Sequence, residues 1–340
     1  MEQNYALLQV SLASPSVHLA SPAQNAREHT LLIQQAASAK SSILVFPELS
    51  LSGATCADPF FQPALTDAVE DAAVKLAAAS AAAPGLLIVA GAPLRQAGKL
   101  YNAGVLFLNG RILGAVSKTF LTAAECRYFS VLPVGDTVAV NWADQSFHLG
   151  QQVFTLPWGR DTLKLGLEIG EDASALFAPG QHLAAAGAEI LCNVAAANSL
   201  VSKNRQRETF VAQNSARLRA ACLYANAGTG ESSTDLVFGS QLLVAENGKL
   251  VAKTDTDYSP DSQLLHSYAD LGAVRYARRR DSVYAASACT NSLPEVFIKA
   301  VDLSLNASCP AASLRPVSRY PFVPEDIREL ATAFYTRFYH

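Results

Sequence analysis

The sequence of 340 residues has no long apolar run and little charge. A helix that crosses a bilayer needs about 20 consecutive apolar residues, and no run approaches that length. Asp, Glu, Lys and Arg make up only 16% of the chain and leave a net charge of -3, whereas nucleic-acid-binding proteins are usually basic. We therefore expect no membrane and no nucleic-acid partner. Because so little of the surface is charged, we expect a homo-oligomer, a dimer or larger, with buried subunit contacts.

Paired cysteines and clustered histidines are also absent. The six cysteines are widely spaced without a C-x-x-C pair, and the six histidines form neither an H-E-x-x-H nor an H-x-x-E-H pattern. Such spacing fits neither a disulfide framework nor a zinc site. The first four residues lack the basic and apolar regions of a secretion signal. We expect a cytoplasmic protein with reduced thiols, no metal and no cofactor.

Apolar residues make up 50% of the chain, and their spacing predicts an α/β fold. The predicted strands are 5–10, 43–46, 86–90, 105–108, 112–116, 163–169, 190–195, 222–227, 241–245 and 250–253, and the predicted helices are 25–40, 65–83 and 203–221. Asn109-Gly110 and Asn247-Gly248 are typical of hairpin turns. Strands that alternate with helices but include hairpins indicate mixed sheets. Two such sheets, stacked with helices outside, would make four layers.

No linker, repeat or low-complexity segment divides the chain. We expect one domain over residues 1–300 and a C-terminal extension over 301–340. Six aromatic residues of the extension fit either packing on their own domain or contact with another subunit. They are Tyr320, Phe322, Phe334, Tyr335, Phe338 and Tyr339. The basic stretch 275–280 fits a solvated face or a contact between subunits.

Charged residues follow three of the predicted buried strands. Glu48 follows one strand, Lys118 follows a hairpin strand, and Glu171 and Asp172 follow a third. Ligand sites in α/β sheets gather outside the carboxyl ends of strands. Each residue taken singly is most often only a solvated charge, so the signal is their order along the chain.

That order is F-P-E-L-S-L-S-G, then G-R-I-L-G-A-V-S-K-T-F-L, then L-G-L-E-I-G-E-D. It resembles the nitrilase, or carbon–nitrogen hydrolase, superfamily. The motifs at 100–102, 125–129 and 230–238 (L-Y-N, E-C-R-Y-F and G-E-S-S-T-D-L-V-F) make the chain most similar to the glutaminase domain of glutamine-dependent NAD synthetase. The resemblance covers nearly the whole chain and implies a four-layer αββα sandwich with mixed sheets.

The resemblance also implies a mechanism. In the family a cysteine thiolate attacks the side-chain amide of glutamine, a glutamate acts as general base, and a lysine stabilises the oxyanion. By position, Glu48 would be the base and Lys118 the oxyanion partner. The nucleophile position falls on Gly170, which has no side chain and cannot form a thioester. A replacement thiol could come from Cys126, whereas we expect Cys192 in the core.

The positions implied for substrate binding are altered too. Glu171, Ala197 and Lys203 are the implied substrate-binding positions, and Glu125 is a secondary one. Ala195 and Ala197 stand where the family has serines, and Ser174 stands where it usually has tryptophan. The segment 122–125 lacks the tyrosine that the family places there.

These departures lead to three hypotheses. The first is a catalytically silent relative that acts through assembly or by binding a ligand, with a related synthetase or a small carboxamide as its partner. The alternative is an engineered knock-out, at Gly170, of an active glutaminase or amidase that releases ammonia from a carboxamide through a cysteine thioester. A third is hydrolysis by a water activated by Glu48 or Glu171. No phosphate-binding loop of the S-G-G-x-D-S type occurs, so we expect no ATP-dependent synthetase domain.

Overall fold

A computed structural model describes residues 6–255, 258–289, 296–307 and 331–332. The chain divides into two compact units, residues 1–309 and 310–340. The helices and strands reported below belong to the first unit. The aromatic residues singled out between Tyr320 and Tyr339 lie outside the described residues.

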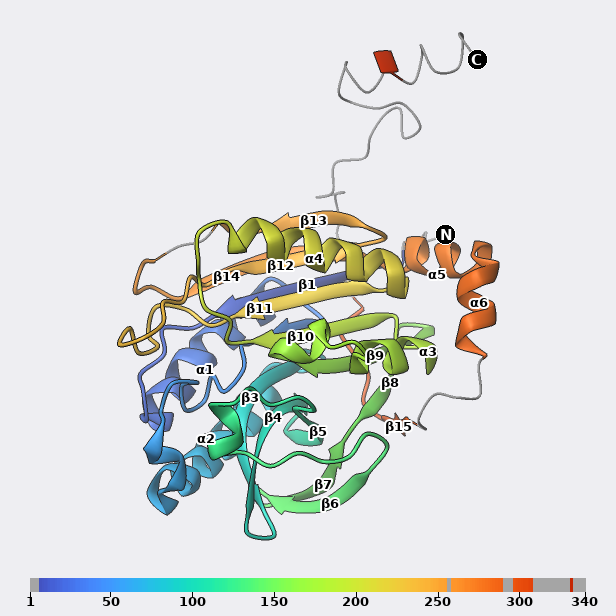
Figure 1. Cartoon of the computed structure of the whole chain (residues 1–340). Helices are drawn as coiled ribbons and strands as arrows, with labels where there is room; N and C mark the ends of the chain where they lie inside the picture. Colours follow the sequence, from blue (N-terminus) through green and yellow to red (C-terminus); the bar gives the residue numbers. More distant parts are fainter. Residues whose placement is uncertain (1–5, 256–257, 290–295, 308–330, 333–340) are drawn as a thin grey trace. The chain divides into compact units, whose positions relative to one another are not determined.

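Two mixed sheets form the centre of the first unit (Figure 1). The first sheet has the order β14-β1-β2-β3-β4-β5-β7-β6 and the second the order β13-β12-β11-β10-β9-β8-β15. The first contains β1 (Leu7–Ser14), β2 (Ile43–Val45), β3 (Leu87–Gln96), β4 (Lys99–Leu108), β5 (Arg111–Ser117), β6 (Thr137–Trp142), β7 (Gln145–Gly150) and β14 (Gln263–Asp270). The second contains β8 (Gln152–Trp158), β9 (Asp161–Ile169), β10 (Ile190–Ala195), β11 (Ala221–Asn226), β12 (Leu242–Glu246), β13 (Lys249–Lys253) and β15 (Phe297–Ala300).

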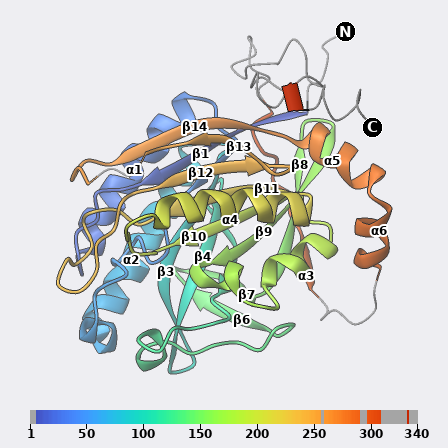
Figure 2. The same cartoon turned by 45° about the horizontal axis from the view of Figure 1, so that its top comes forward.

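Helices cover the outer face of each sheet. The α-helices are α1 (Pro22–Ser38), α2 (Pro63–Ala81), α3 (Pro179–Ala185), α4 (Lys203–Leu218), α5 (Leu271–Arg280) and α6 (Ser282–Ala288). Helix α2 packs on β3, and α4 packs on β11 and β12. Figure 2 shows α3 and α4 lying over the second sheet.

Three apolar layers hold the two sheets and their helices together. Side chains alternate between the faces of a strand, and β2 shows the consequence. Leu44 belongs to the layer beneath α1 and α2, whereas Ile43 and Val45 belong to the layer between the sheets. A third layer, which includes Leu183 and Leu243, lies beneath α3 and α4. Helix, sheet, sheet and helix therefore stack as the predicted αββα sandwich.

Both hairpins that the sequence predicts are present. The φ angles of Asn109 and Gly110 are 50° and 84°, and those of Asn247 and Gly248 are 47° and 86°. A type I′ turn requires positive φ at both central residues, so the Asn-Gly pairs determine these turns. The predicted strands and helices are found with shifted ends, but the sequence reading missed β6, β7, β8, β14, β15, α3, α5 and α6.

The expectation of a solvated face for residues 275–280 is wrong for two of its arginines. Arg275, on α5, forms ion pairs with Glu189 and Asp161. Arg278 donates to the carbonyl oxygens of Gly187 and Ala188. These partners are far away in the sequence, so the basic run alone could not show that two of its arginines make contacts within the domain.

The boundary expected after residue 300 lies too early. Leu305 forms a bridge with Trp158 at the end of β8, and its N–H donates to the carbonyl of Pro157. The segment after β15 therefore continues along β8 as far as Leu305, at the edge of the second sheet. Among the described helices, none combines the length and the apolar character that a membrane span requires.

Candidate active site

The candidate site lies where strands of both sheets end. Glu48 follows β2, Lys118 follows β5, and Gly170 follows β9. Strands β2 and β5 point the same way, since β2 is parallel to β3 while β4 is antiparallel to both β3 and β5. The three positions line a cavity of about 590 Å³. The order noticed in the sequence thus corresponds to a single place in the fold, as expected for carboxyl ends of strands.

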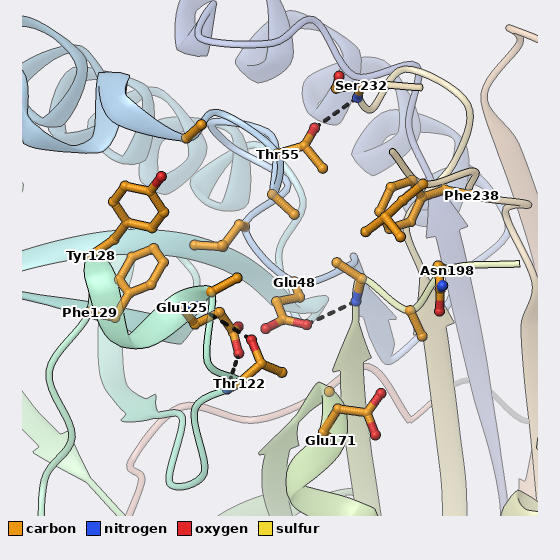
Figure 3. A pocket seen from close by; sticks show the side chains of 18 of the residues that line it. Glu48, Thr55, Thr122, Glu125, Tyr128, Phe129, Glu171, Asn198, Ser232 and Phe238 are labelled. Atoms are coloured by element: carbon orange, nitrogen blue, oxygen red, sulfur yellow. Dashed lines mark hydrogen bonds between the residues drawn. The ribbon is translucent and has the colours of Figure 1, made fainter. Parts of the chain in front are cut away.

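Aromatic side chains form two facing walls of the cavity. Tyr128 and Phe129 lie on one side, and Phe238 lies on the other, next to Asn198 (Figure 3). Phe60 packs edge-on against Phe129, with ring centroids 5.0 Å apart. The walls are mostly apolar, with a few polar groups between them, as is usual for small-molecule sites.

A buried ion network occupies the floor of the cavity. Lys118 Nζ lies 2.7 Å from Glu48 Oε1 and 2.7 Å from Glu125 Oε1. The side chains of Lys118 and Glu48 are only 3% and 4% exposed. One ammonium therefore bridges a buried carboxylate and a second one, Glu125, that is 19% exposed. Charges buried in this way must be paired, because desolvating an unpaired one costs several kcal/mol.

Two neutral donors fix the orientation of Glu48. Asn102 Nδ2 donates to Glu48 Oε1 at 2.7 Å and to Glu125 Oε1 at 3.2 Å. On the other oxygen, the N–H of Ala196 donates to Glu48 Oε2 at 2.9 Å. Ala196 follows β10 of the second sheet, so Glu48 is held from both sheets.

The network shifts the pKa of each of its members. Burial raises the pKa of Glu48, although Lys118 opposes that shift. Burial alone would lower the pKa of Lys118, but the two carboxylates outweigh it and raise that pKa. Burial would raise the pKa of Glu125, but Lys118 and the N–H of Thr122 lower it. Lys118 is therefore a permanent cation, and Glu48 is the member that accepts a proton most readily.

Gly170 faces this network directly. Its φ angle is +52°, and a β-carbon added there would lie 2.7 Å from Glu48 Oε2 and 3.1 Å from Lys118 Nζ. A side chain at this position would therefore point between the carboxylate and the ammonium. The left-handed backbone is one that residues other than glycine adopt only under strain.

Two buried carboxyl groups lie beside the turn that carries Gly170. Asp172 accepts from the N–H groups of Thr119 and Phe120, the latter at 2.7 Å. Burial raises the pKa of Asp172 to about 7, although these N–H groups oppose it. Burial, with the charge of Asp172, also raises the pKa of Glu168 to about 7. Asp172 thus ties the turn after β9 to the segment after β5.

A second buried carboxylate network fixes another part of the wall. Glu231 accepts from the N–H groups of Ala54 and Thr55 at 2.8 and 2.9 Å and from the Thr55 hydroxyl at 2.6 Å. The N–H of Ser232 donates to the same hydroxyl oxygen at 2.8 Å. The segment after β11 is thereby joined to the segment after β2, and both line the cavity.

Most of the site positions inferred from the sequence come together. Besides Glu48, Lys118 and Gly170, the lining includes Glu125, Glu171 and Ala197. Lys203, the first residue of α4, lies behind the lining and donates to Asn198 Oδ1. Lys203 is therefore not part of the cavity lining, where we expected it, and instead holds the side chain of the lining residue Asn198.

Neither of the two thiols considered from the sequence, Cys126 and Cys192, replaces the missing side chain. Cys126 is exposed and is not part of the cavity lining. Cys192 lies in the core as expected, where burial raises the pKa of its thiol. Among the described residues, no group of three or more His, Cys, Asp or Glu side chains could hold a metal ion.

Several residues of the site were quoted in sequence motifs without a role. Asn102 belongs to L-Y-N, Tyr128 and Phe129 to E-C-R-Y-F, and Phe238 to the segment that begins at Gly230. The N–H of Ala196 has no signal in the sequence, because a backbone donor depends on the turn and not on the residue type.

The αββα sandwich with a buried carboxylate–ammonium–carboxylate network at its strand ends defines a nitrilase-type fold and site. The pattern of the family named Carbon-nitrogen hydrolase matches residues 6–265. This chain therefore belongs to the carbon–nitrogen hydrolase family.

Similar proteins agree with this assignment. The chain is 31% identical to the glutamine-dependent NAD(+) synthetase of Mycobacterium bovis over 335 residues, which are 96% of this chain and 48% of that protein. The Mycobacterium leprae protein of the same name is also 31% identical, with 95% and 48% covered. The chain thus spans about half the length of these curated relatives.

Solved structures show the same fold. A glutamine-dependent NAD(+) synthetase from Cytophaga hutchinsonii has a TM-score of 0.66 at 23% identity, with 77% of this chain and 43% of that one covered. A carbon-nitrogen hydrolase from Helicobacter pylori has a TM-score of 0.66 at 19% identity, with 82% and 94% covered.

Proposed function

We propose that this protein is a catalytically silent carbon–nitrogen hydrolase that binds a small carboxamide in the cavity over Glu48, Lys118 and Glu125. The observation that carries the proposal is the geometry at Gly170. The position that points between the general base and the ammonium has no side chain, and the described residues that line the cavity include no thiol. The covalent route to ammonia needs a nucleophile at that place.

The remaining groups support binding better than turnover. Both oxygens of Glu48 already accept hydrogen bonds, from Lys118, Asn102 and the N–H of Ala196. A lysine ammonium has three donors, and two of the donors of Lys118 are used by carboxylates. The third can donate to the carbonyl oxygen of an amide, which orients the ligand but breaks no bond.

Release of ammonia tests the proposal. We expect the purified protein to release no ammonia above the buffer rate from L-glutamine, L-asparagine or pentanamide. Glu48→Gln serves as the matched control because it removes the base and preserves the shape of the side chain. Ammonia release that disappears in Glu48→Gln would contradict catalytic silence and would favour a water activated by a carboxylate.

A second candidate function is an active amidase or glutaminase in which glycine has been introduced at position 170. The complete Glu48–Lys118–Glu125 network favours it. Gly170→Cys separates the two candidates. Full turnover in this variant, together with a cysteine codon in the source gene, would identify an introduced knock-out. A glycine codon in the source gene, with no turnover in the variant, supports the silent protein.

The proposal includes self-assembly in the cytoplasm, with a related synthetase as a further partner. Exposed apolar side chains in the segments just before α3 and α4 support assembly, since large exposed apolar surfaces often mark contact surfaces. Leu176, Phe177, Leu200 and Val201 are 83%, 69%, 62% and 97% exposed. Light scattering on the purified protein would show a dimer or larger species, and a monomer at all concentrations would contradict the assembly.

A further inference from the structure

The charges that line the cavity are mostly negative. Among the described lining residues, four are carboxylates, and the lining cation is Lys118. The carboxylates are Glu48, Glu125, Glu171 and Asp235. Even with a proton on Glu48, the lining keeps more negative than positive charge. The apolar walls strengthen the electrostatic field of this net negative charge, because they exclude water that would otherwise screen it.

The positive charge of Lys118 is already neutralised. Its ammonium lies 2.7 Å from each of two carboxylate oxygens. A carboxylate on a ligand would have to compete with both of these buried partners. The lining therefore offers Lys118 as a donor to a neutral carbonyl group and not as a counter-ion for a second anion.

Three further cations lie outside the lining, and each has partners of its own. Arg127 pairs with Asp58 at 2.8 Å and lies over the ring of Tyr128, 5.6 Å from its centroid. Lys203 donates to the side chain of Asn198. Arg207 donates to the Gln241 side chain at 2.7 Å and to the carbonyl oxygen of Asn198 at 3.1 Å. None of the three lines the cavity, so a carboxylate bound inside it would not be paired directly with any of them.

The outer part of the cavity is suited to a cation. Glu171 and Asp235 both line it and are exposed. Tyr128 and Phe238 line it as well, on opposite sides in Figure 3. Aromatic faces and carboxylates both attract the positive charge of an ammonium group.

We propose that the cavity selects a cationic carboxamide, a short chain with an amide at one end and an ammonium at the other, and disfavours ligands that carry a carboxylate. This inference rests on the proposed function and names its ligand class. The amide carbonyl accepts from Lys118, and the ammonium lies near Glu171 and Asp235. A zwitterion such as glutamine would bind less well, since its carboxylate has no counter-ion in the described lining.

Three probes of similar length separate charge from shape. They are 4-aminobutanamide (cationic), pentanamide (neutral) and 4-carbamoylbutanoate (anionic), with L-glutamine as a zwitterionic fourth. Titrations followed by ligand-observed NMR at low salt would give each dissociation constant. We expect 4-aminobutanamide to bind about fivefold more tightly than pentanamide, and pentanamide about fivefold more tightly than the anion. The differences should shrink at high salt.

Variants locate the preference in the cavity. In the double variant Glu171→Gln/Asp235→Asn, we expect the preference for the cation over pentanamide to fall to about twofold or less. Asp302→Asn is the control, because it removes an exposed carboxylate that pairs with Arg111 outside the cavity. The control should keep the full preference.

The outcomes separate this inference from the proposed function. Equal binding of all four amides, or tighter binding of glutamine or of the anion, would overturn the cationic ligand and leave a carboxamide-binding protein. Binding of none of them would overturn both. A preference that the double variant leaves unchanged would also overturn the assignment to Glu171 and Asp235.

Discussion

The two sheets contribute very differently to the cavity. From the first sheet come Glu48 and Lys118, charged, buried and hydrogen-bonded. At the positions next to Glu48, the second sheet contributes Gly170, Ala196 and Ala197, which offer backbone and methyl groups. The family resemblance implies reacting and substrate-binding side chains at Gly170 and Ala197, and none is present.

This difference can be explained by structure without any catalytic role. Removal of one member of the ion network leaves a buried charge without a partner. A side chain that points into an open cavity can be lost without that consequence. Glu48 and Lys118 are therefore constrained by folding, whereas a reacting side chain at position 170 or a hydroxyl at position 197 would be kept only by chemistry. Preservation of Glu48 and Lys118 is thus weak evidence for turnover.

The largest expected effect comes from Lys118→Met. The variant keeps the volume of the side chain but leaves the buried Glu48 and the largely buried Glu125 side by side without a cation. We expect it to lower the free energy of unfolding by about 3–5 kcal/mol at pH 7, measured by urea denaturation. Lys253→Met is the control, since Lys253 pairs with Glu208 near the surface, and should cost less than about 1 kcal/mol. Equal losses of stability in Lys118→Met and Lys253→Met would contradict the explanation that folding preserves Glu48 and Lys118.

The second prediction concerns Glu168, at the end of β9, whose pKa is raised from 4.5 to about 7 by burial and the charge of Asp172. The folded state therefore keeps a proton that the unfolded state releases above about pH 4.5. The contribution of Glu168 to stability is therefore greatest below that pH and falls by about 1.4 kcal/mol per pH unit up to about pH 7. Asp172, whose pKa is also raised to about 7, adds a slope of the same sign, so Glu168→Gln should reduce the total slope, whereas Glu208→Gln should preserve it. An unchanged slope in Glu168→Gln would show that the decline arises elsewhere.

Gly170→Ala tests how closely the first-sheet network approaches the second sheet. The added methyl group would meet Glu48 Oε2 at 2.7 Å in a backbone with φ of +52°. We expect a loss of about 2–3 kcal/mol, from strain plus displacement of Glu48. The matched control is Gly98→Ala, where φ is +76° but no atom lies within 4 Å, and strain alone should cost about 1 kcal/mol. Similar losses of stability for both variants would mean that the Glu48 side chain moves away from the added methyl group at little cost.

Ala197→Ser should have the smallest effect. Ala197 lines the cavity, and its backbone is fixed by Asn226, whose side chain bonds both its N–H and its carbonyl oxygen. A hydroxyl there enters open space, so we expect the free energy of unfolding to change by less than about 0.5 kcal/mol. A loss above about 1 kcal/mol would show that this side of the cavity is packed as tightly as the other.

The sequence predicted the elements of the site better than its contacts. Glu48, Lys118 and Gly170 could be located because each follows a strand that is buried and apolar, and their order matched a family. Lys203 could not be placed, since whether a residue at a helix start faces a cavity depends on the packing of the whole helix. The inward contacts of Arg275 depend on Glu189 and Asp161, which are 86 and 114 positions away.

The missed strands have a physical explanation as well. Residues 137–158 mix polar and apolar side chains without a clean alternation, and β7 and β8 are separated only by Gln151. The rest of the fold was predictable because its strands are continuous apolar runs between two layers. At the site, the sequence showed that position 170 lacks a nucleophilic side chain. It did not show that a side chain at this position would point between Glu48 and Lys118.

Transfer of an acyl group to hydroxylamine tests the account most directly. An enzyme that forms an acyl intermediate from an amide passes the acyl group to hydroxylamine and yields a hydroxamate. The account predicts that the unaltered protein, incubated with hydroxylamine and pentanamide, 4-aminobutanamide or L-glutamine, forms no hydroxamate above the protein-free rate. Hydroxamate that forms with the unaltered protein and disappears in Glu48→Gln would contradict it.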